Sequence, residues 1–233
     1  MNAAVPGDGR PRLALFDLDH TLLQVDSDHS WGVFTTQIGW TDPLAFAERN
    51  DAFYRDYKAG TLDIHEYVRF ATEAVRERGP QQAEVAHARF MQEVVLPAVP
   101  DASLQLVRGH REAGEITLIV TATNEFVTAP ISELFLVDEL IAVRLARDER
   151  GWITGEIDGV PSAREGKVTR MEQWLAARGW NWADVHTTFY SDSINDLSLL
   201  ERVDMPVATN PDARLRELAL SRGWRVLDLF EKK

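Results

Sequence analysis

The chain has 233 residues and an acidic excess, with 37 aspartates and glutamates against 25 lysines and arginines and a formal net charge of −12. Its length suits one compact domain, or a core with a smaller inserted domain. Its 45% hydrophobic and 27% charged residues are typical of a globular protein rather than a disordered or fibrous one. The acids are spread along the chain, which argues against nucleic acid as a partner because phosphate binding needs clustered basic side chains.

The absence of cysteine excludes further kinds of site. Without cysteine there is no disulfide framework, no thiolate zinc site and no cysteine nucleophile. No apolar run approaches the ~18–20 residues of a membrane helix, and the segment before residue 12 has no apolar core of signal-peptide length. We therefore expect a cytoplasmic protein without a membrane partner, while the sequence leaves the oligomeric state open.

Short apolar runs recur along the chain in the manner of buried parallel strands. They cover residues 12–16, 115–120, 187–190, 206–208 and 224–229. Between the later runs, helical patterns occupy residues 167–177, 194–201 and 212–221. Strands that alternate with amphipathic helices predict an α/β fold, a doubly wound, Rossmann-like parallel sheet with helices on both faces.

The stretch after the first strand follows a different pattern, with helical periodicity only. Thr41-Asp42-Pro43 and Gly60 are expected to cap, turn and stop its helices. We predict an inserted α-helical cap domain at residues 26–97 and a core domain at 1–25 and 98–233. Four apolar stripes are interpreted as its packing faces: Trp31, Phe34 and Ile38; Phe46, Phe53 and Tyr57; Ile64, Val68, Ala71 and Val75; and Val85, Ala88 and Val95.

A third kind of pattern occupies residues 138–158. Alternating residues at 140–147 and 152–157 flank a turn at 148–151 that contains glycine. This arrangement predicts a β-hairpin flap.

Two aspartates, Asp17 and Asp19, follow the first strand directly. The carboxyl ends of strands in open α/β sheets are where ligands usually bind. Carboxylates this close repel each other, but one can attack an electrophile while the other transfers protons. The alternative is a capped turn in which Asp19 and Thr21 bond to backbone amides.

The second strand ends in Thr121-Ala-Thr-Asn124. The Thr121 hydroxyl and the amides around Ala122 are candidates to hold a phosphate, while Asn124 or Thr128 could instead cap a helix. Further on, Lys167 begins a helix and could face the same edge of the sheet. The alternative for Lys167 is an exposed surface charge.

A fourth segment places Asp192, Asn195 and Asp196 after a later strand. Together with Asp17 and Asp19 these acids would gather at one sheet edge, which is costly without a cation. Oxygen ligands suit Mg²⁺, and Lys167 could neutralise part of the remaining charge. The alternative for the later acids is helix capping.

The four segments DLDHT, TATN, EGK and SDSIND, in this order, resemble the haloacid dehalogenase-like hydrolase superfamily. The helical insertion after the first segment resembles its phosphoserine-phosphatase-like subclass. The resemblance implies an aspartyl-phosphate intermediate and Mg²⁺ as cofactor. It implies these roles: Asp17 as nucleophile, Asp19 as acid and base, and Thr121, Ala122, Lys167 and Asn195 for phosphate. At the metal it implies Asp17, Asp19 through its backbone carbonyl, Asp192 and, close by, Asp196.

Two positions differ from phosphoserine phosphatases. Nine residues after the nucleophile, where those enzymes have a glutamate for the substrate ammonium, this chain has Asp26, which could equally cap a helix. The position of their cap arginine corresponds to Ala71, while Arg69 lies on another helix face. These differences argue against strict phosphoserine specificity. Trp31 is a further candidate for substrate contact.

We therefore predict a Mg²⁺-dependent phosphatase acting on a small-molecule phosphomonoester, with amino-alcohol phosphates such as phosphoserine or histidinol phosphate as candidates. The alternative is a phosphorylatable, receiver-like signalling module without rapid turnover. The built-in acid Asp19 and the enclosing helical insertion favour the enzyme. A dehalogenase of the same superfamily is disfavoured because Asp19 suits phosphoryl chemistry.

Overall fold

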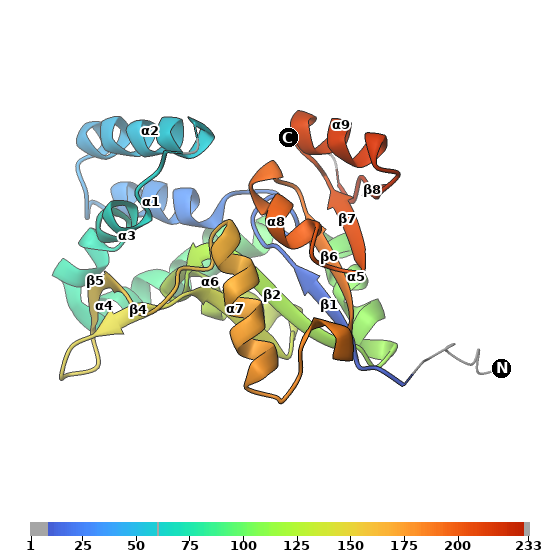
Figure 1. Cartoon of the computed structure of the whole chain (residues 1–233). Helices are drawn as coiled ribbons and strands as arrows, with labels where there is room; N and C mark the ends of the chain where they lie inside the picture. The colour runs from blue at the N-terminus through green and yellow to red at the C-terminus, as the bar shows by residue number, and fades with distance from the viewer. Residues whose placement is uncertain (1–8, 60, 231–233) are drawn as a thin grey trace.

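The computed structural model describes residues 9–59 and 61–230, and within them a six-stranded sheet forms the centre of the molecule (Figure 1). Its order is β3-β2-β1-β6-β7-β8, and every neighbouring pair is parallel. This sheet confirms the predicted doubly wound α/β fold. The strands are β1 (Arg12–Phe16), β2 (Ile116–Asn124), β3 (Glu139–Val143), β6 (His186–Ser191), β7 (Met205–Thr209) and β8 (Arg225–Leu227).

The strand register aligns the predicted motifs at one edge. Phe16 of β1 pairs with Ile119 of β2 on one side and with Tyr190 of β6 on the other. Asp17 follows Phe16 directly, so it lies beside the last residues of β2 and β6, which continue past these partners to Asn124 and Ser191. The chain order reverses at β1, which makes this edge a topological switch point, where ligands bind in such folds.

Alternate residues of β1 point into two hydrophobic cores, one on each face of the sheet. Leu13 and Leu15 belong to a core shared with α7 (Glu165–Ala176), α8 (Leu197–Leu200) and α9 (Ala213–Ser221). Ala14 and Phe16 belong to the other core, which includes residues of α5 (Asp101–Glu112) and α6 (Glu125–Phe135). Burial on both faces explains why β1 is a continuous apolar run.

Four helices follow β1 and lie together beside the carboxyl edge of the sheet (Figure 1). A π-helical turn (Met91–Val95) and a 3-10 turn (Leu96–Ala98) then lead into α5. We call α1–α4 the cap helices; the domain boundaries at residues 26 and 97 stay a prediction. The cap helices are α1 (Ser27–Gln37), α2 (Pro43–Ala59), α3 (Ile64–Ala71) and α4 (Glu73–Phe90).

The predicted apolar faces of the cap helices hold in part. Trp31 and Phe34 are buried as expected. The stripe through Val85 is wrong, because Val85 is 65% exposed while α4 buries Ala83, Ala86, His87 and Phe90 instead. The face of α4 that carries His87 and Phe90 is turned to the core instead, where both side chains pack against Trp31, while Val95 of the stripe, in the π-helical turn, is buried.

The predicted hairpin is shorter than expected. Its strands are β4 (Leu145–Arg147) and β5 (Ile153–Ile157), paired antiparallel. Residues 140–143 instead belong to β3 and pair in parallel with β2, because their apolar side chains complete the central sheet. The hairpin packs on α3 and α4, and an ion pair of 3.0 Å joins Arg69 to Glu156.

Other expectations differ by a few residues at most. The helix expected over residues 194–201 is a 3-10 turn (Ile194–Asp196) followed by the four-residue α8. Within the described residues no helix is long and apolar enough to cross a membrane. The expected stop at Gly60 and residues 1–8 of the N-terminal segment lie outside the described residues.

Candidate active site

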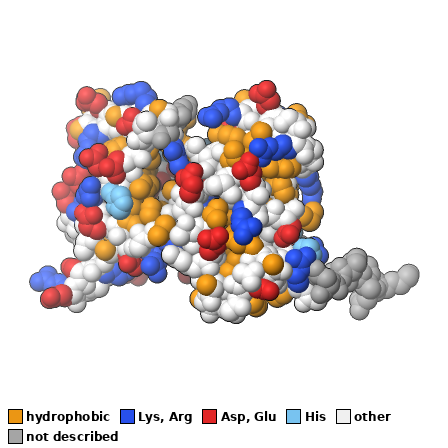
Figure 2. All heavy atoms as spheres, viewed as in Figure 1, with side chains coloured by type: hydrophobic (Ala, Val, Ile, Leu, Met, Phe, Trp, Pro, Cys, Tyr) orange, Lys and Arg blue, Asp and Glu red, His pale blue; other side chains and the backbone are white. Residues whose placement is uncertain are grey.

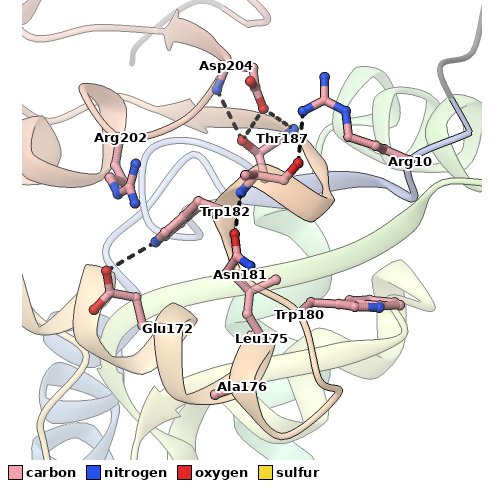
Figure 3. A pocket seen from close by; sticks show the side chains of 11 residues that line it. Arg10, Glu172, Leu175, Ala176, Trp180, Asn181, Trp182, Thr187, Arg202 and Asp204 are labelled. Atoms are coloured by element: carbon pink, nitrogen blue, oxygen red, sulfur yellow. Dashed lines mark hydrogen bonds between the residues drawn. The ribbon is translucent and has the colours of Figure 1, made fainter.

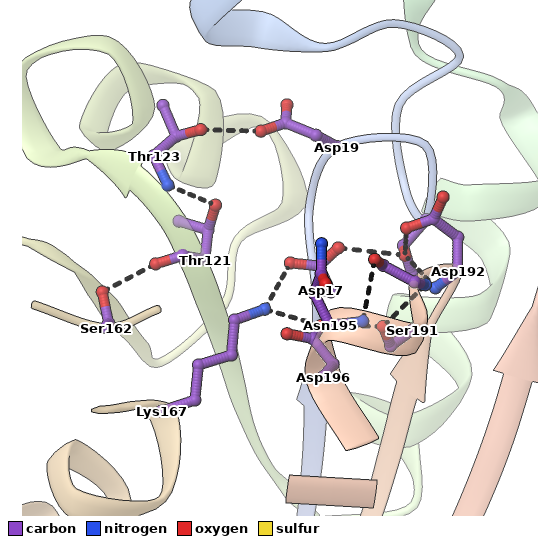
Figure 4. Close-up of polar contacts among 12 residues, drawn as sticks. Asp17, Asp19, Thr121, Thr123, Ser162, Lys167, Ser191, Asp192, Asn195 and Asp196 are labelled. Atoms are coloured by element: carbon purple, nitrogen blue, oxygen red, sulfur yellow. Dashed lines mark hydrogen bonds and ion pairs between the residues drawn. The ribbon is translucent and has the colours of Figure 1, made fainter. Parts of the chain in front are cut away.

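Lys167 lies at the centre of the predicted site, only 1% exposed, so its interpretation as a surface charge is wrong. Its Nζ is 2.7 Å from Asp17 Oδ1 and 2.7 Å from Asp196 Oδ2 (Figure 4). The start of α7 sets this position, since a Cβ at Gly166 would lie 2.0 Å from the Pro161 carbonyl oxygen. A glycine is required there to let the chain place Lys167 over the sheet edge.

The charged side chains of this group shift one another's pKa values. Burial raises the pKa of Asp17 to about 6, although Lys167 acts in the opposite direction. Burial alone would lower the pKa of Lys167, but the negative charges of Asp17 and Asp196 outweigh it and raise that pKa. The result is a fixed buried cation between two carboxyl groups, an arrangement able to hold a phosphoryl group next to Asp17.

Asp192 meets Asp17 at a buried hydroxyl. The Oγ1 of Thr21 lies 3.3 Å from Asp17 Oδ2 and 3.5 Å from Asp192 Oδ1, and it accepts a bond of 3.0 Å from the Asp192 amide. Asn210 Nδ2 donates to the carbonyl oxygens of His20 and Thr21 and holds this loop in place. Asp17 and Asp192 thus present hard oxygen atoms to one small space.

Asp19 faces away from Asp17. Its carboxyl group accepts a 2.8 Å bond from the Thr123 hydroxyl (Figure 4). It accepts another 2.8 Å bond from the Ser27 amide. Burial, with the nearby charge of Asp26, raises the pKa of Asp19 well above its ordinary value. The two aspartates therefore have different environments: Asp17 is ion-paired, and Asp19 is disposed to carry a proton.

The four predicted metal ligands are not gathered as side chains. Asp19 faces Thr123, and Asp196 accepts from Lys167 and from the Ser191 hydroxyl at 2.7 Å. In the described part of the chain no three or more histidine, aspartate or glutamate side chains are grouped to hold a metal ion. Asp17 and Asp192 share Thr21 as a neighbour, and Asp17 and Asp196 share Lys167.

Thr121 is 1% exposed, and the strand pairing changes around it. The register between β2 and β3 shifts between Val120 and Asn124, so Ala122 lies in an irregular stretch. The Thr121 hydroxyl oxygen accepts from the Thr123 amide at 3.1 Å, which leaves its proton available for a ligand. The Thr121 carbonyl accepts from Ser162, which no motif indicated.

The cap helices reach the core through Tyr57, which the sequence placed in an apolar stripe. Its side chain hydrogen-bonds to those of Asn195 and Ser193. Ser193 also caps the turn by accepting from the Asn195 amide at 3.2 Å. Figure 2 shows the hollow between the cap helices and the core, with acidic and basic side chains interspersed on this face.

The other candidates have clear positions. Asp26 caps α1 by accepting from the His29 amide at 2.8 Å, as its alternative predicted. Arg69 is paired with Glu156 of the hairpin. Trp31, 1% exposed, packs against aromatic side chains of α1, α4 and α6. Asn124 caps α6, as predicted, by accepting from the Val127 amide at 3.3 Å.

One acidic residue at this edge was missed. Asp28, in the first turn of α1 and 8% exposed, accepts a 3.2 Å bond from Asn124 Nδ2 and another from the Tyr67 hydroxyl. Burial and the charge of Asp26 raise the pKa of Asp28 to about 7. An acid in a first helical turn looks ordinary in sequence, so no local signal marked it.

A surface pocket of about 560 Å³ lies elsewhere, at the amino-terminal edge of the sheet (Figure 3). Trp182 Nε1 donates to Glu172 there, and Asp204 accepts from the amide and hydroxyl of Thr187. These polar side chains of the pocket hydrogen-bond to other residues that line it, and none of the predicted catalytic residues is among them.

Comparison with known proteins gives consistent results. Residues 14–201 match the haloacid dehalogenase-like hydrolase family. The chain is 41% identical over 217 residues to a histidinol-phosphatase of Neisseria meningitidis serogroup C. The alignment covers 93% of this chain and 98% of that protein. A structure of a Bordetella pertussis protein of unknown function has a TM-score of 0.89 at 45% identity, covering 95% of this chain and all of the other. A substrate-bound phosphoserine phosphatase shares the fold, with a TM-score of 0.65 at 17% identity over 97% of this chain and 95% of the other.

The chain belongs to the haloacid dehalogenase-like hydrolase family. This confirms the resemblance inferred from the four motifs. The prediction of an enzyme, a phosphatase of this family, is likewise confirmed.

Proposed function

We propose that the protein hydrolyses a small phosphomonoester through an aspartyl-phosphate at Asp17. The supporting observation is the division between the two aspartates: Lys167 pairs with Asp17 at 2.7 Å, while Asp19 is turned to Thr123 and has a raised pKa. One carboxyl group is thus suited to attack and the other to donate a proton, as acid and nucleophile pairs require.

In the first half-reaction, an Asp17 oxygen bonds to phosphorus as the bond to the alcohol oxygen breaks. Asp19 gives its proton to that leaving oxygen. In the second half-reaction, water loses a proton to Asp19 and attacks phosphorus, which releases phosphate and restores Asp17. Lys167 and the Thr121 hydroxyl bind the transferring oxygens, with Ala122 and Asn195 at the rim.

The donor set around Thr21 fits Mg²⁺, since Asp17 Oδ2 and Asp192 Oδ1 lie 3.3 and 3.5 Å from one hydroxyl. Asp17, Asp192 and the Asp19 carbonyl would hold the ion, with Asp196 nearby. When bound, Mg²⁺ supplies positive charge that lets an anionic carboxylate approach an anionic phosphate. Asp196 meanwhile holds Lys167 in place at 2.7 Å.

The substrate class we propose is an amino-alcohol phosphate, with histidinol phosphate as the first candidate. The relative at 41% identity is named a histidinol-phosphatase. The basic residue closest in sequence to the expected carboxylate-binding position, Arg69, is engaged with Glu156. This pairing disfavours phosphoserine, whose carboxylate would need a cation.

A phosphatase assay tests the proposal. With Mg²⁺ the protein should hydrolyse p-nitrophenyl phosphate and release phosphate over many turnovers, and chelation should abolish the activity. Asp17→Asn should reduce turnover at least ~10³-fold, because the nucleophile is removed. A phosphoprotein that persists for hours without turnover would instead support the receiver-like alternative, and full activity of Asp17→Asn would exclude Asp17 as nucleophile.

A further inference from the structure

Three elements hold the Asp28 carboxyl group. Asp28 belongs to α1, Tyr67 to α3, and Asn124 ends β2. Both partners donate: Asn124 Nδ2 at 3.2 Å and the Tyr67 hydroxyl. The carboxyl group of Asp28 is therefore fixed where the cap helices meet the edge of the sheet.

This position lies beside the proposed acid. The Ser27 amide, one residue before Asp28, donates to Asp19 Oδ1 at 2.8 Å. On the other side, the consecutive residues Thr123 and Asn124 donate to Asp19 and Asp28 respectively. The leaving oxygen must approach Asp19 to receive its proton, so the alcohol attached to it extends towards Asp28.

Three carboxyl groups lie close together here, and the described side chains give none of them an ion-pair partner. Among the described side chains, none of the ion pairs within 4.0 Å includes Asp19, Asp26 or Asp28. A carboxylate offers about four acceptor positions, and Asn124 and Tyr67 occupy two of those on Asp28. A positively charged N–H group can therefore bind there, whereas a carboxylate would be repelled.

We propose that Asp28, oriented by Asn124 and Tyr67, is a specificity-determining residue that binds a cationic N–H group of the leaving amino alcohol. It thereby selects amino-alcohol phosphates without a carboxylate over phosphoserine. This inference rests on the proposed function and adds a residue to it that no motif contains.

The first test uses the unmodified protein and Mg²⁺. The kcat/KM for histidinol phosphate should exceed those for phosphoserine and glycerol phosphate by at least about tenfold, as expected for a charge-assisted hydrogen bond against a repelled or missing group. A smaller margin over phosphoserine overturns the inference, while hydrolysis of p-nitrophenyl phosphate would still support the proposed function.

The second test compares Asp28→Asn with a matched control, Asp42→Asn, which removes an exposed acid that caps α2 by accepting from the Ala45 amide. In Asp28→Asn the ratio of kcat/KM for histidinol phosphate to that for p-nitrophenyl phosphate should fall at least about fivefold, through KM. In Asp42→Asn the ratio should match the unmodified protein. A smaller fall, in a variant with an unchanged circular dichroism spectrum, overturns the inference. If Asp28→Asn does not fold, the same ratio of kcat/KM values is measured for Tyr67→Phe, which lacks one of the two donors to Asp28.

Discussion

The two walls of the candidate active site are built in different ways. The core wall carries Asp17 after β1, Lys167 at the start of α7 and Asp196 after β6, and Lys167 and Asp196 are 1% and 4% exposed and form an ion pair. The cap wall carries Asp28, which reaches the core through a bond from Asn124, and Tyr57, which bonds to Asn195 and Ser193. In the proposed function the core wall performs the chemistry and the cap wall selects the substrate.

The largest expected effect falls on the core wall. Lys167→Met leaves Asp17 and Asp196 buried without their cation, so unfolding free energy should drop by ~3–5 kcal/mol and turnover by at least ~10²-fold. Urea titration and the p-nitrophenyl phosphate assay measure both. As a control, Arg178→Met breaks the exposed pair with Glu139 and should cost less than ~1 kcal/mol. Equal losses in the two variants would show that the buried pair has no special role.

Asp19→Asn should have the next effect. The variant lacks the proton donor and the base, so kcat on an alkyl phosphate should fall by ~10²–10⁴-fold. The loss should be smaller on p-nitrophenyl phosphate, whose leaving group needs little protonation. Steady-state kinetics on both substrates give the comparison, and an equal loss on the two would argue against Asp19 as the acid.

The cap wall should respond to pH. The pKa of Asp28 is raised from 3.8 to about 7 in the folded protein, which corresponds to ~4 kcal/mol as an upper bound. Because the raised pKa belongs to the folded state, the stability associated with protonated Asp28 is complete below pH ~4 and is lost as pH rises through 7. Asp28→Asn should therefore gain stability relative to the unmodified protein between pH 4 and 8. Thermal unfolding at several pH values checks this, and a gap between the two proteins that stays constant with pH would contradict it.

The smallest expected effect concerns Tyr57. Tyr57→Phe removes the bonds to Asn195 and Ser193 but keeps the ring, so activity should fall by about two- to tenfold with little change in melting temperature. Tyr54→Phe, which likewise removes one hydroxyl from a 52% exposed ring on the same helix, is the matched control. If both variants behave alike, the contact of Tyr57 with the core has no part in activity.

The sequence predicted the core wall far better than the cap wall. Strand β1 was predicted residue for residue, because its apolar run is buried on both faces, and parallel strand ends must meet at one edge. Asp17 and Asp196 were predicted to converge for this reason, and both lie 2.7 Å from Lys167, which was predicted at the start of a helix. Motifs that follow strands are therefore informative about position.

The cap wall depends on tertiary packing that no local pattern encodes. Asp28 looked like an ordinary first-turn acid and Tyr57 like part of an apolar stripe, and each acquires its contacts from another element. The Val85 stripe failed because α4 packs on α1 through another face, with His87 and Phe90 against Trp31. Ser162 and Thr123 were missed since a single hydroxyl in a loop or strand carries no periodic signal.

The central claim is that Asp17 carries the phosphoryl group during turnover. Acid-quenching the protein with substrate and Mg²⁺, followed by peptide mass spectrometry, tests it directly. The account predicts a phosphate, 80 Da in mass, on the peptide that contains Asp17, more abundant in Asp19→Asn and absent from Asp17→Asn. Turnover with no phosphorylated peptide in either active form, or with the phosphate on another residue, would contradict it.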